Sequence, residues 1–187
     1  MRILTFDVGI KNLSFCLVDT DPFTIIQWKT VSTIDKDLAC KKVGIEELTL
    51  ATLVTLQTHF DDNSAIDLVL VENQPGAMNG LMKSISMVIY TYFNMMVLHG
   101  QVKQVRFISA TNKLKCKLNT DKKAKLTYPL RKKKSVELCA QYLVQIAPDR
   151  VNWFNAIKKA DDYSDTFLYI MYYMESEMVK GTRHVAS

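Results

Sequence analysis

Three features common in other protein classes are missing from this sequence. Its 187 residues include four cysteines, and none of them forms a CxxC pair. This predicts a reduced, intracellular protein and excludes the common thiolate metal sites. The six glycines form no glycine-rich phosphate loop, which argues against an ATPase. The N-terminus, MRILTFDVG, meets an acid too early to be a signal peptide.

A long uninterrupted hydrophobic run is also missing. The most apolar stretch, residues 81–98, contains Lys83 and Asn94, whereas a membrane span needs about 20 clean apolar residues. We therefore expect no membrane association. Because single domains usually contain about 100–200 residues, we expect one domain over residues 1–187. The tail from residue 180 onward is expected to be disordered.

Acidic residues are nearly absent from one window of the chain. Residues 103–134 hold twelve basic residues and one acid, Asp121, although the net charge of the whole chain is only +5. This concentration predicts a nucleic-acid partner, with a solvated charged face or a localisation signal at 131–134 as alternatives. The residues expected to bind nucleic acid are Lys115, Lys117, Lys122, Lys123, Lys125, Arg131 and Lys132.

The hydrophobic periodicity predicts an α/β fold. Three strands follow one another too closely for parallel crossovers, so they should form an antiparallel meander. A fourth strand has the continuous apolar character of a buried parallel strand. We expect a five-stranded mixed sheet flanked by helices. The predicted strands are 2–8, 13–18, 24–33, 67–74 and 102–109, the predicted helices are 44–60, 81–98, 131–146 and 158–178, and 110–130 is a loop.

Four acidic residues stand where apolar segments end or begin. Asp7 and Glu72 end two apolar strands, and Asp162 and Asp165 share one face near the start of the last helix. Each alone could be a turn former, a surface charge or a helix cap, but together they predict a metal site. Converging carboxylates repel by about 4 kcal/mol per pair at an effective dielectric of about 20. Hard oxygen ligands favour Mg²⁺ or Mn²⁺, and a pair of such ions suits phosphodiester hydrolysis, although the spacing leaves a phosphotransferase open.

Three motifs make the chain resemble Holliday junction resolvases of the RuvC-like superfamily, most closely those of poxviruses and other large DNA viruses. The motifs are DVGIKNLSF (7–15), VENQP (71–75) and ADDYSDTFL (160–168). The resemblance implies an RNase H-like fold. It also implies a metal-dependent endonuclease that resolves four-way DNA junctions, and an action where viral DNA is replicated in the host cell.

The resemblance also assigns roles to particular residues. It makes the four acids the ligands of two metal ions, and it makes Lys113, in ATNK, the catalytic lysine that stabilises charge at the scissile phosphate. It implies a homodimer through the nearly all-apolar helix 81–98, and we expect Ile89 and Phe93 of that helix to lie in the interface. A core helix is the alternative reading of that segment.

Some properties of the resembled enzymes cannot be transferred directly. Bacterial members carry an aromatic wedge soon after the second-motif glutamate, whereas here NQPGAMN follows Glu72. Two other functions stay open at this stage. One is an RNase H-type hydrolase of RNA–DNA hybrids, and the other is a non-catalytic nucleic-acid-binding module on the same fold.

Overall fold

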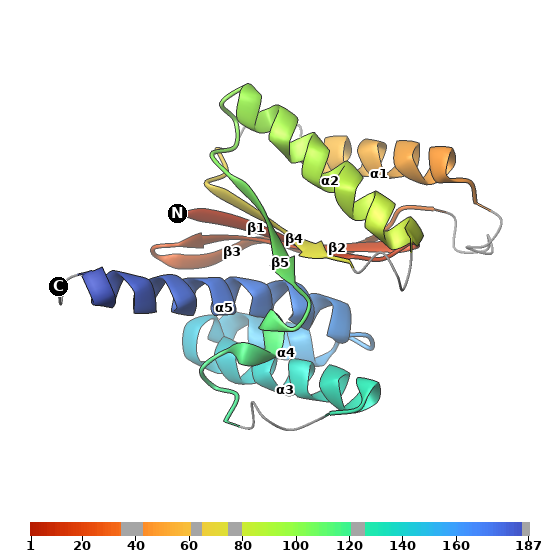
Figure 1. Ribbon diagram of the computed structural model, residues 1–187. Helices are drawn as coiled ribbons and strands as arrows, with labels where there is room; N and C mark the ends of the chain where they lie inside the picture. Colours follow the sequence, from red (N-terminus) through yellow and green to blue (C-terminus); the bar gives the residue numbers. More distant parts are fainter. Residues whose placement is uncertain (35–42, 61–64, 75–79, 121–125, 185–187) are drawn as a thin grey trace. The chain divides into compact units, whose positions relative to one another are not determined.

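The chain contains two compact units, Met1–Ala110 and Thr111–Ser187 (Figure 1). The computed structural model describes all residues except 35–42, 61–64, 75–79, 121–125 and 185–187, and it leaves out the side chains of 178–184. The first unit holds the sheet, and the described part of the second is helical. The expectation of one domain over residues 1–187 stays a prediction.

The first unit is a five-stranded sheet with two helices on one face (Figure 1). Its elements are β1 (Arg2–Val8), β2 (Asn12–Thr20), β3 (Phe23–Ser32), α1 (Ile45–Phe60), β4 (Leu68–Asn73), α2 (Gly80–Leu98) and β5 (Val105–Ser109). The strand order is β3-β2-β1-β4-β5. The first three strands are antiparallel neighbours, while β4 is parallel to both β1 and β5. The predicted mixed sheet and its meander are confirmed.

The core of this unit lies between the sheet and its two helices. Phe6 of β1 is fully buried there. Its ring centroid lies 6.0 Å from that of Phe15, 5.6 Å from that of Phe60 and 5.3 Å from that of Phe93. Because side chains alternate between the faces of a strand, Asp7 points to the face that α1 and α2 do not cover.

Helix α2 is apolar on more than the face it buries. Ile89 and Phe93 are fully buried in the core of the first unit. The prediction that they lie in a dimer interface is therefore wrong, because the sheet already covers them. Met87 and Met95, by contrast, are 42% and 50% exposed. By length and composition alone, α2 is also the one helix among the described residues that could cross a membrane.

The second unit is a group of helices in which α3 packs on α5. Its elements are η2 (Asn112–Lys115), α3 (Tyr128–Ile146), η3 (Pro148–Arg150), α4 (Val151–Asn155) and α5 (Asp161–His184). Leu138, Leu143 and Phe154 are among its buried side chains. Helix α3 begins three residues earlier than expected, because Pro129 is well tolerated in a first turn, where its missing N–H costs nothing.

Other boundaries in this unit also differ from expectation. The short helices η3 and α4 lie between the predicted helices 131–146 and 158–178, and they were not predicted because elements this short show no helical period. Helix α5 continues to His184. Residues 180–184 are thus part of this helix, and the disorder expected of the last residues stays a prediction. Residues 185–187 lie outside the described part.

Candidate metal and DNA site

The pairing of β1 with β4 brings Asp7 and Glu72 side by side. The parallel register places Phe6 opposite Val71, so the next residue of each strand lies at the same edge of the sheet. Both acids point away from the face whose side chains pack under α1 and α2. The sequence indicated only that two strands end in an acid, and the structure makes those strands neighbours.

Glu72 is a buried carboxylate whose hydrogen bonding is incomplete. The residue is only 6% exposed, and its Oε2 has no hydrogen-bond partner among the described residues. A buried charge that lacks a partner is strongly unfavourable. Neighbouring carboxylate oxygens are the hard ligands that Mg²⁺ and Mn²⁺ prefer. Glu72 beside Asp7 therefore fits a divalent cation.

The backbone around these two acids is fixed by the turn after β1 and by the end of β4. The Gly9 N–H donates to the Asn12 carbonyl at 3.1 Å. A Cβ at Gly9 would lie 2.7 Å from that carbonyl oxygen, so only glycine fits this close approach. Gln74 Nε2 donates to the Val8 carbonyl at 3.3 Å. This bond joins the chain after Glu72 to the end of β1.

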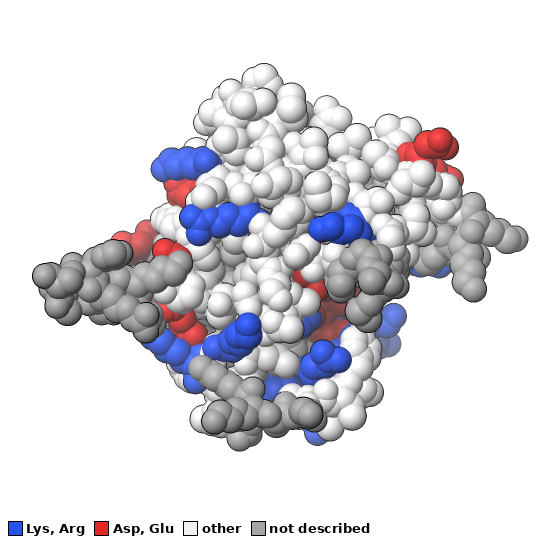
Figure 2. All heavy atoms as spheres, viewed as in Figure 1, with Lys and Arg blue, Asp and Glu red and all other residues white. Residues whose placement is uncertain are grey.

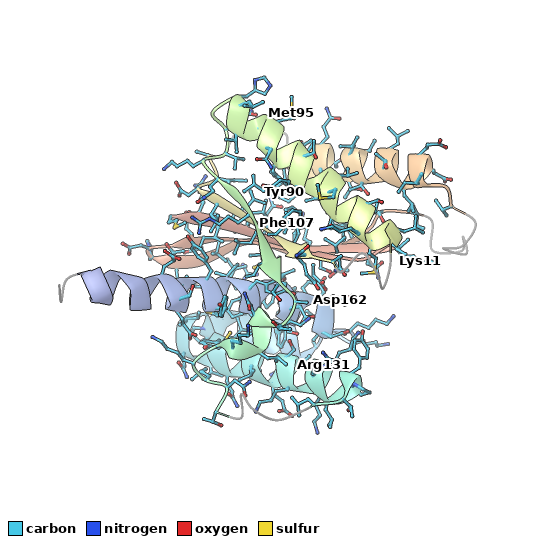
Figure 3. All side chains as sticks on the ribbon, viewed as in Figure 1. Lys11, Tyr90, Met95, Phe107, Arg131 and Asp162 are labelled. Atoms are coloured by element: carbon cyan, nitrogen blue, oxygen red, sulfur yellow. The ribbon has the colours of Figure 1, made fainter. Side chains whose placement is uncertain are left out.

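In the second unit, three elements meet at Asp165 of α5. The residue is 7% exposed. Ser135 of α3 donates a 2.5 Å hydrogen bond from Oγ to Asp165 Oδ1, and Lys113 of η2 forms an ion pair with Asp165 Oδ2. Asp162, labelled in Figure 3, is half-buried near the start of the same helix. The lysine chosen from the sequence thus contacts a predicted metal ligand.

The segment that follows Lys113 is fastened to α3 and α5. Glu175 accepts a hydrogen bond from the Lys117 N–H at 2.7 Å and another from the Tyr142 hydroxyl. Burial raises the pKa of Tyr142, so this hydroxyl remains a donor. The Cys116 thiol donates to the Lys113 carbonyl at 3.2 Å. Lys113 therefore extends from a backbone with defined anchors.

Lys132, like Lys113, is paired with an acid of α5. It forms an ion pair with Asp161, and that hydrogen bond raises the pKa of Lys132. Its Nζ also lies 5.2 Å from the ring centre of Tyr128. Asp161 thus balances part of the Lys132 charge, which reduces what this lysine can offer to a phosphate.

The other basic residues expected to bind DNA are exposed where the structure describes them. Lys115, Lys117 and Arg131 are exposed on the second unit. Figure 2 shows Lys and Arg side chains spread over the surface of this unit. The remaining three lie outside the described residues, and they are Lys122, Lys123 and Lys125.

The predicted metal ligands are divided equally between the units. Asp7 and Glu72 belong to the first, and Asp162 and Asp165 belong to the second. Among the described residues, no group of three acidic, histidine or cysteine side chains gathers around one point.

Three supporting residues were not predicted from the sequence. Gln74 lies two residues after Glu72 within VENQP, so its position was a usable signal. Ser135 follows a run of lysines, and Glu175 lies ten residues after Asp165. Neither shows a local pattern, because their partners come from other elements.

Comparison with known sequences identifies a family and one relative. The profile of the family described as "Poxvirus A22 protein" matches residues 1–177. An uncharacterized protein of Acanthamoeba polyphaga mimivirus, L451, is 32% identical over a stretch that covers 64% of this chain. The chain spans about a third of that protein, since the stretch covers 31% of its length.

Three solved structures share the fold of this chain. Fowlpox virus resolvase, in complex with Holliday junction DNA, has a TM-score of 0.65 at 19% identity and covers 94% of this chain and 98% of its own. The yeast mitochondrial Holliday junction resolvase Ydc2 has a TM-score of 0.59 at 17% identity and covers 92% of this chain and 78% of its own. RuvC of Thermus thermophilus, in complex with its Holliday junction substrate, has a TM-score of 0.53 at 12% identity and covers 95% of this chain and 96% of its own. The expected RNase H-like fold is thereby confirmed.

Proposed function

Because the chain belongs to the Poxvirus A22 protein family, we propose that it is a metal-dependent endonuclease that resolves four-way DNA junctions. The observation that carries this proposal is Glu72, a buried carboxylate beside Asp7 whose Oε2 has no partner among the described residues. A cation beside this carboxylate would compensate its buried charge. By the same proposal, the protein acts where viral DNA is replicated in the host cell.

The two pairs of acids would together hold two Mg²⁺ or Mn²⁺ ions. Bound there, the ions would activate a water molecule and stabilise the departing oxygen of the phosphodiester. Asp7 and Glu72 would contribute from the sheet, and Asp162 and Asp165 from the start of α5. Their negative charge would be spread over the ions, which removes the repulsion between converging carboxylates.

Ser135 and Lys113 contact different oxygens of Asp165 and would have different roles. Ser135 holds one carboxylate oxygen by its 2.5 Å hydrogen bond, which fixes the direction of the other. Lys113, which pairs with that other oxygen, would stabilise the negative charge of the scissile phosphate once a metal ion balances the charge of Asp165. Ser135 acts through Asp165 and is a positioning residue.

Replacing Ser135 with alanine should lower junction cleavage by about 10- to 100-fold, the usual loss when a partner that orients a metal ligand is removed. The Mg²⁺ concentration for half-maximal rate should rise, because Asp165 loses the bond that holds it. Threonine at this position keeps the hydroxyl and should recover most of the rate. Equal rates in the alanine variant and the wild type would remove Ser135 from the site.

Phosphate contacts of the basic residues should supply most of the DNA affinity. A log–log plot of affinity against salt should then fall by about 0.7 to 0.9 per neutralised phosphate. Lys115 and Lys117 are both exposed. Changing both to glutamine should reduce the slope by the contribution of about one to two neutralised phosphates. Lys133→Gln, which removes another exposed lysine charge on α3, is the control that shows whether loss of any exposed lysine changes the slope. An unchanged slope would place the DNA elsewhere.

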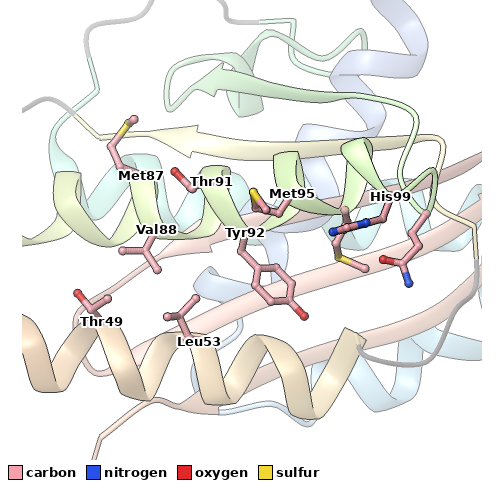
Figure 4. Close-up of a pocket in the computed structure, with 10 residues that line it drawn as sticks. Thr49, Leu53, Met87, Val88, Thr91, Tyr92, Met95 and His99 are labelled. Carbon is pink, nitrogen blue, oxygen red and sulfur yellow. The ribbon is translucent and has the colours of Figure 1, made fainter.

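We also propose that two copies of the chain join through the exposed face of α2. An open groove of about 510 Å³ runs between α1 and α2 (Figure 4). Its lining includes Leu53, Met87, Val88, Tyr92, Met95 and Met96. Apolar surface of this kind favours burial by a partner. A second copy is the natural partner, because cutting a four-way junction on two opposing strands needs two active sites related by two-fold symmetry.

Cleavage of a synthetic four-way junction is the direct test of the proposed function. With Mg²⁺ we expect paired nicks on opposing strands that leave duplexes a ligase can seal. With EDTA we expect binding without cleavage, because the acids alone supply no chemistry to the phosphate. Cleavage that persists after complete metal removal would contradict the proposal.

A further inference from the structure

Trp153 is a large aromatic side chain held at the surface of the second unit. Helix α4 directs the neighbouring Phe154 into the interior, where it is 1% exposed, while Trp153 is 39% exposed. The Trp153 ring meets the ring of Tyr163 edge-on, with centroids 5.6 Å apart and planes at 83°. Tyr163 directly follows Asp162 in the first turn of α5. The tryptophan is therefore fixed next to the part of α5 that carries the acids.

The chain around Trp153 is polar and carries two lysines. Asn152, Asn155, Lys158 and Lys159 are all exposed, and the segment 150–160 that holds them is flanked by Asp149 and Asp161. A protein partner would favour a wider apolar patch around the tryptophan. An aromatic face with nearby ammonium groups instead matches a nucleotide, whose base stacks on the ring and whose phosphate binds a lysine.

We propose that Trp153 is a stacking contact for an unpaired DNA base, with Lys158 and Lys159 binding the adjacent phosphates. Tyr163 is the positioning residue that holds the ring. Stacking needs a base whose face is accessible, so the contact distinguishes branched or single-stranded DNA from an intact duplex. The proposal rests on the proposed function only in placing this contact beside the cleavage site.

Fluorescence reports directly on this contact, because the chain has only two tryptophans. The other, Trp28, is 7% exposed on β3. In a Trp28→Phe variant of the whole protein, the tryptophan emission comes from Trp153 alone. With EDTA present to prevent cleavage, a four-way junction and a single strand should each quench it, while a blunt duplex should leave it nearly unchanged. No quenching by any of these DNAs, or equal quenching by all, overturns the proposal.

Affinity measurements give a second, independent readout. Trp153→Ala should weaken binding to the junction and the single strand by about 5- to 150-fold, the range for one base stacked on an aromatic ring. Duplex affinity should change less than about twofold. Trp153→Tyr keeps a stacking face and should recover most of the loss, whereas Asn152→Ala, an exposed change on the same helix, should have no effect. Equal losses on all DNAs with no recovery by tyrosine would make the role structural and overturn the proposal.

The outcomes separate this proposal from the proposed function. If Trp153→Ala binds and cuts junctions like the wild type, the stacking contact is refuted while the resolvase remains. If the wild type cuts RNA–DNA hybrids but not junctions, and a single strand still quenches Trp153, the stacking contact stands and the resolvase is refuted. Quenching that depends only on protein concentration would identify a protein interface and refute the contact.

Discussion

Replacing Glu72 with glutamine should reduce junction cleavage by more than about 100-fold, while junction binding stays within a few-fold of the wild type. Loss of a residue that merely orients a metal ligand costs about 10- to 100-fold, so loss of a ligand should exceed that range. Binding survives because it depends on the basic residues. We expect the same result for Asp7→Asn and Asp165→Asn, and single-turnover cleavage beside a binding titration measures it.

The same substitution should make the metal-free protein more stable. Glu72 is buried and its Oε2 has no partner among the described residues, so neutralising it removes an unfavourable buried charge. We expect a higher metal-free Tm for Glu72→Gln, and we expect Mg²⁺ to stabilise the wild type more than the variant. Glu137→Gln, which removes an exposed carboxylate near Lys133, is the matched control. A lower metal-free Tm together with lost binding would make Glu72 a structural residue.

Replacing Met95 with lysine should convert the protein from a dimer to a monomer and abolish paired incision. Met95 is 50% exposed and lines the groove between α1 and α2. A charge buried there without a partner costs about 3 to 5 kcal/mol, which weakens the dimer by more than about 100-fold. Analytical ultracentrifugation measures the change, and the spacing of nicks in a cruciform plasmid measures its consequence.

A matched control uses an equally exposed apolar residue elsewhere. Val144 of α3 is 62% exposed and lies on the second unit, so Val144→Lys should leave the dimer intact. The monomeric Met95→Lys protein should still nick one strand of a junction at a time, because each copy carries its own acids. A wild-type protein that sediments as a monomer, both alone and on junction DNA, would refute the dimer.

The strands and the acids could be predicted because each depends on local sequence. Alternation and apolar runs located all five strands, since a strand buries its side chains in a period of two. Asp7 and Glu72 stood out because a carboxylate is costly beside buried apolar residues. Lys113 was chosen by resemblance, and its ion pair with Asp165 places it at a predicted ligand.

The parts that could not be predicted depend on which elements pack together. The sequence of α2 is apolar nearly all round, so nothing in it distinguishes the face with Ile89 and Phe93, which the core buries, from the face with Met87 and Met95. The contact of Ser135 with a residue thirty positions away arises only when α3 meets α5. The short helix α4, which exposes Trp153, spans too few residues to show a period.

Substrate choice tests the central claim most directly. The wild-type protein with Mg²⁺ should be offered a four-way junction, a linear duplex, a flap and an RNA–DNA hybrid in parallel, and initial rates compared at one ionic strength. We predict that the junction is cut fastest, with symmetrical nicks on two opposing strands and products that ligate without further processing. Preferential degradation of the RNA–DNA hybrid, with an uncut junction, would contradict the claim and identify a hybrid hydrolase on the same fold.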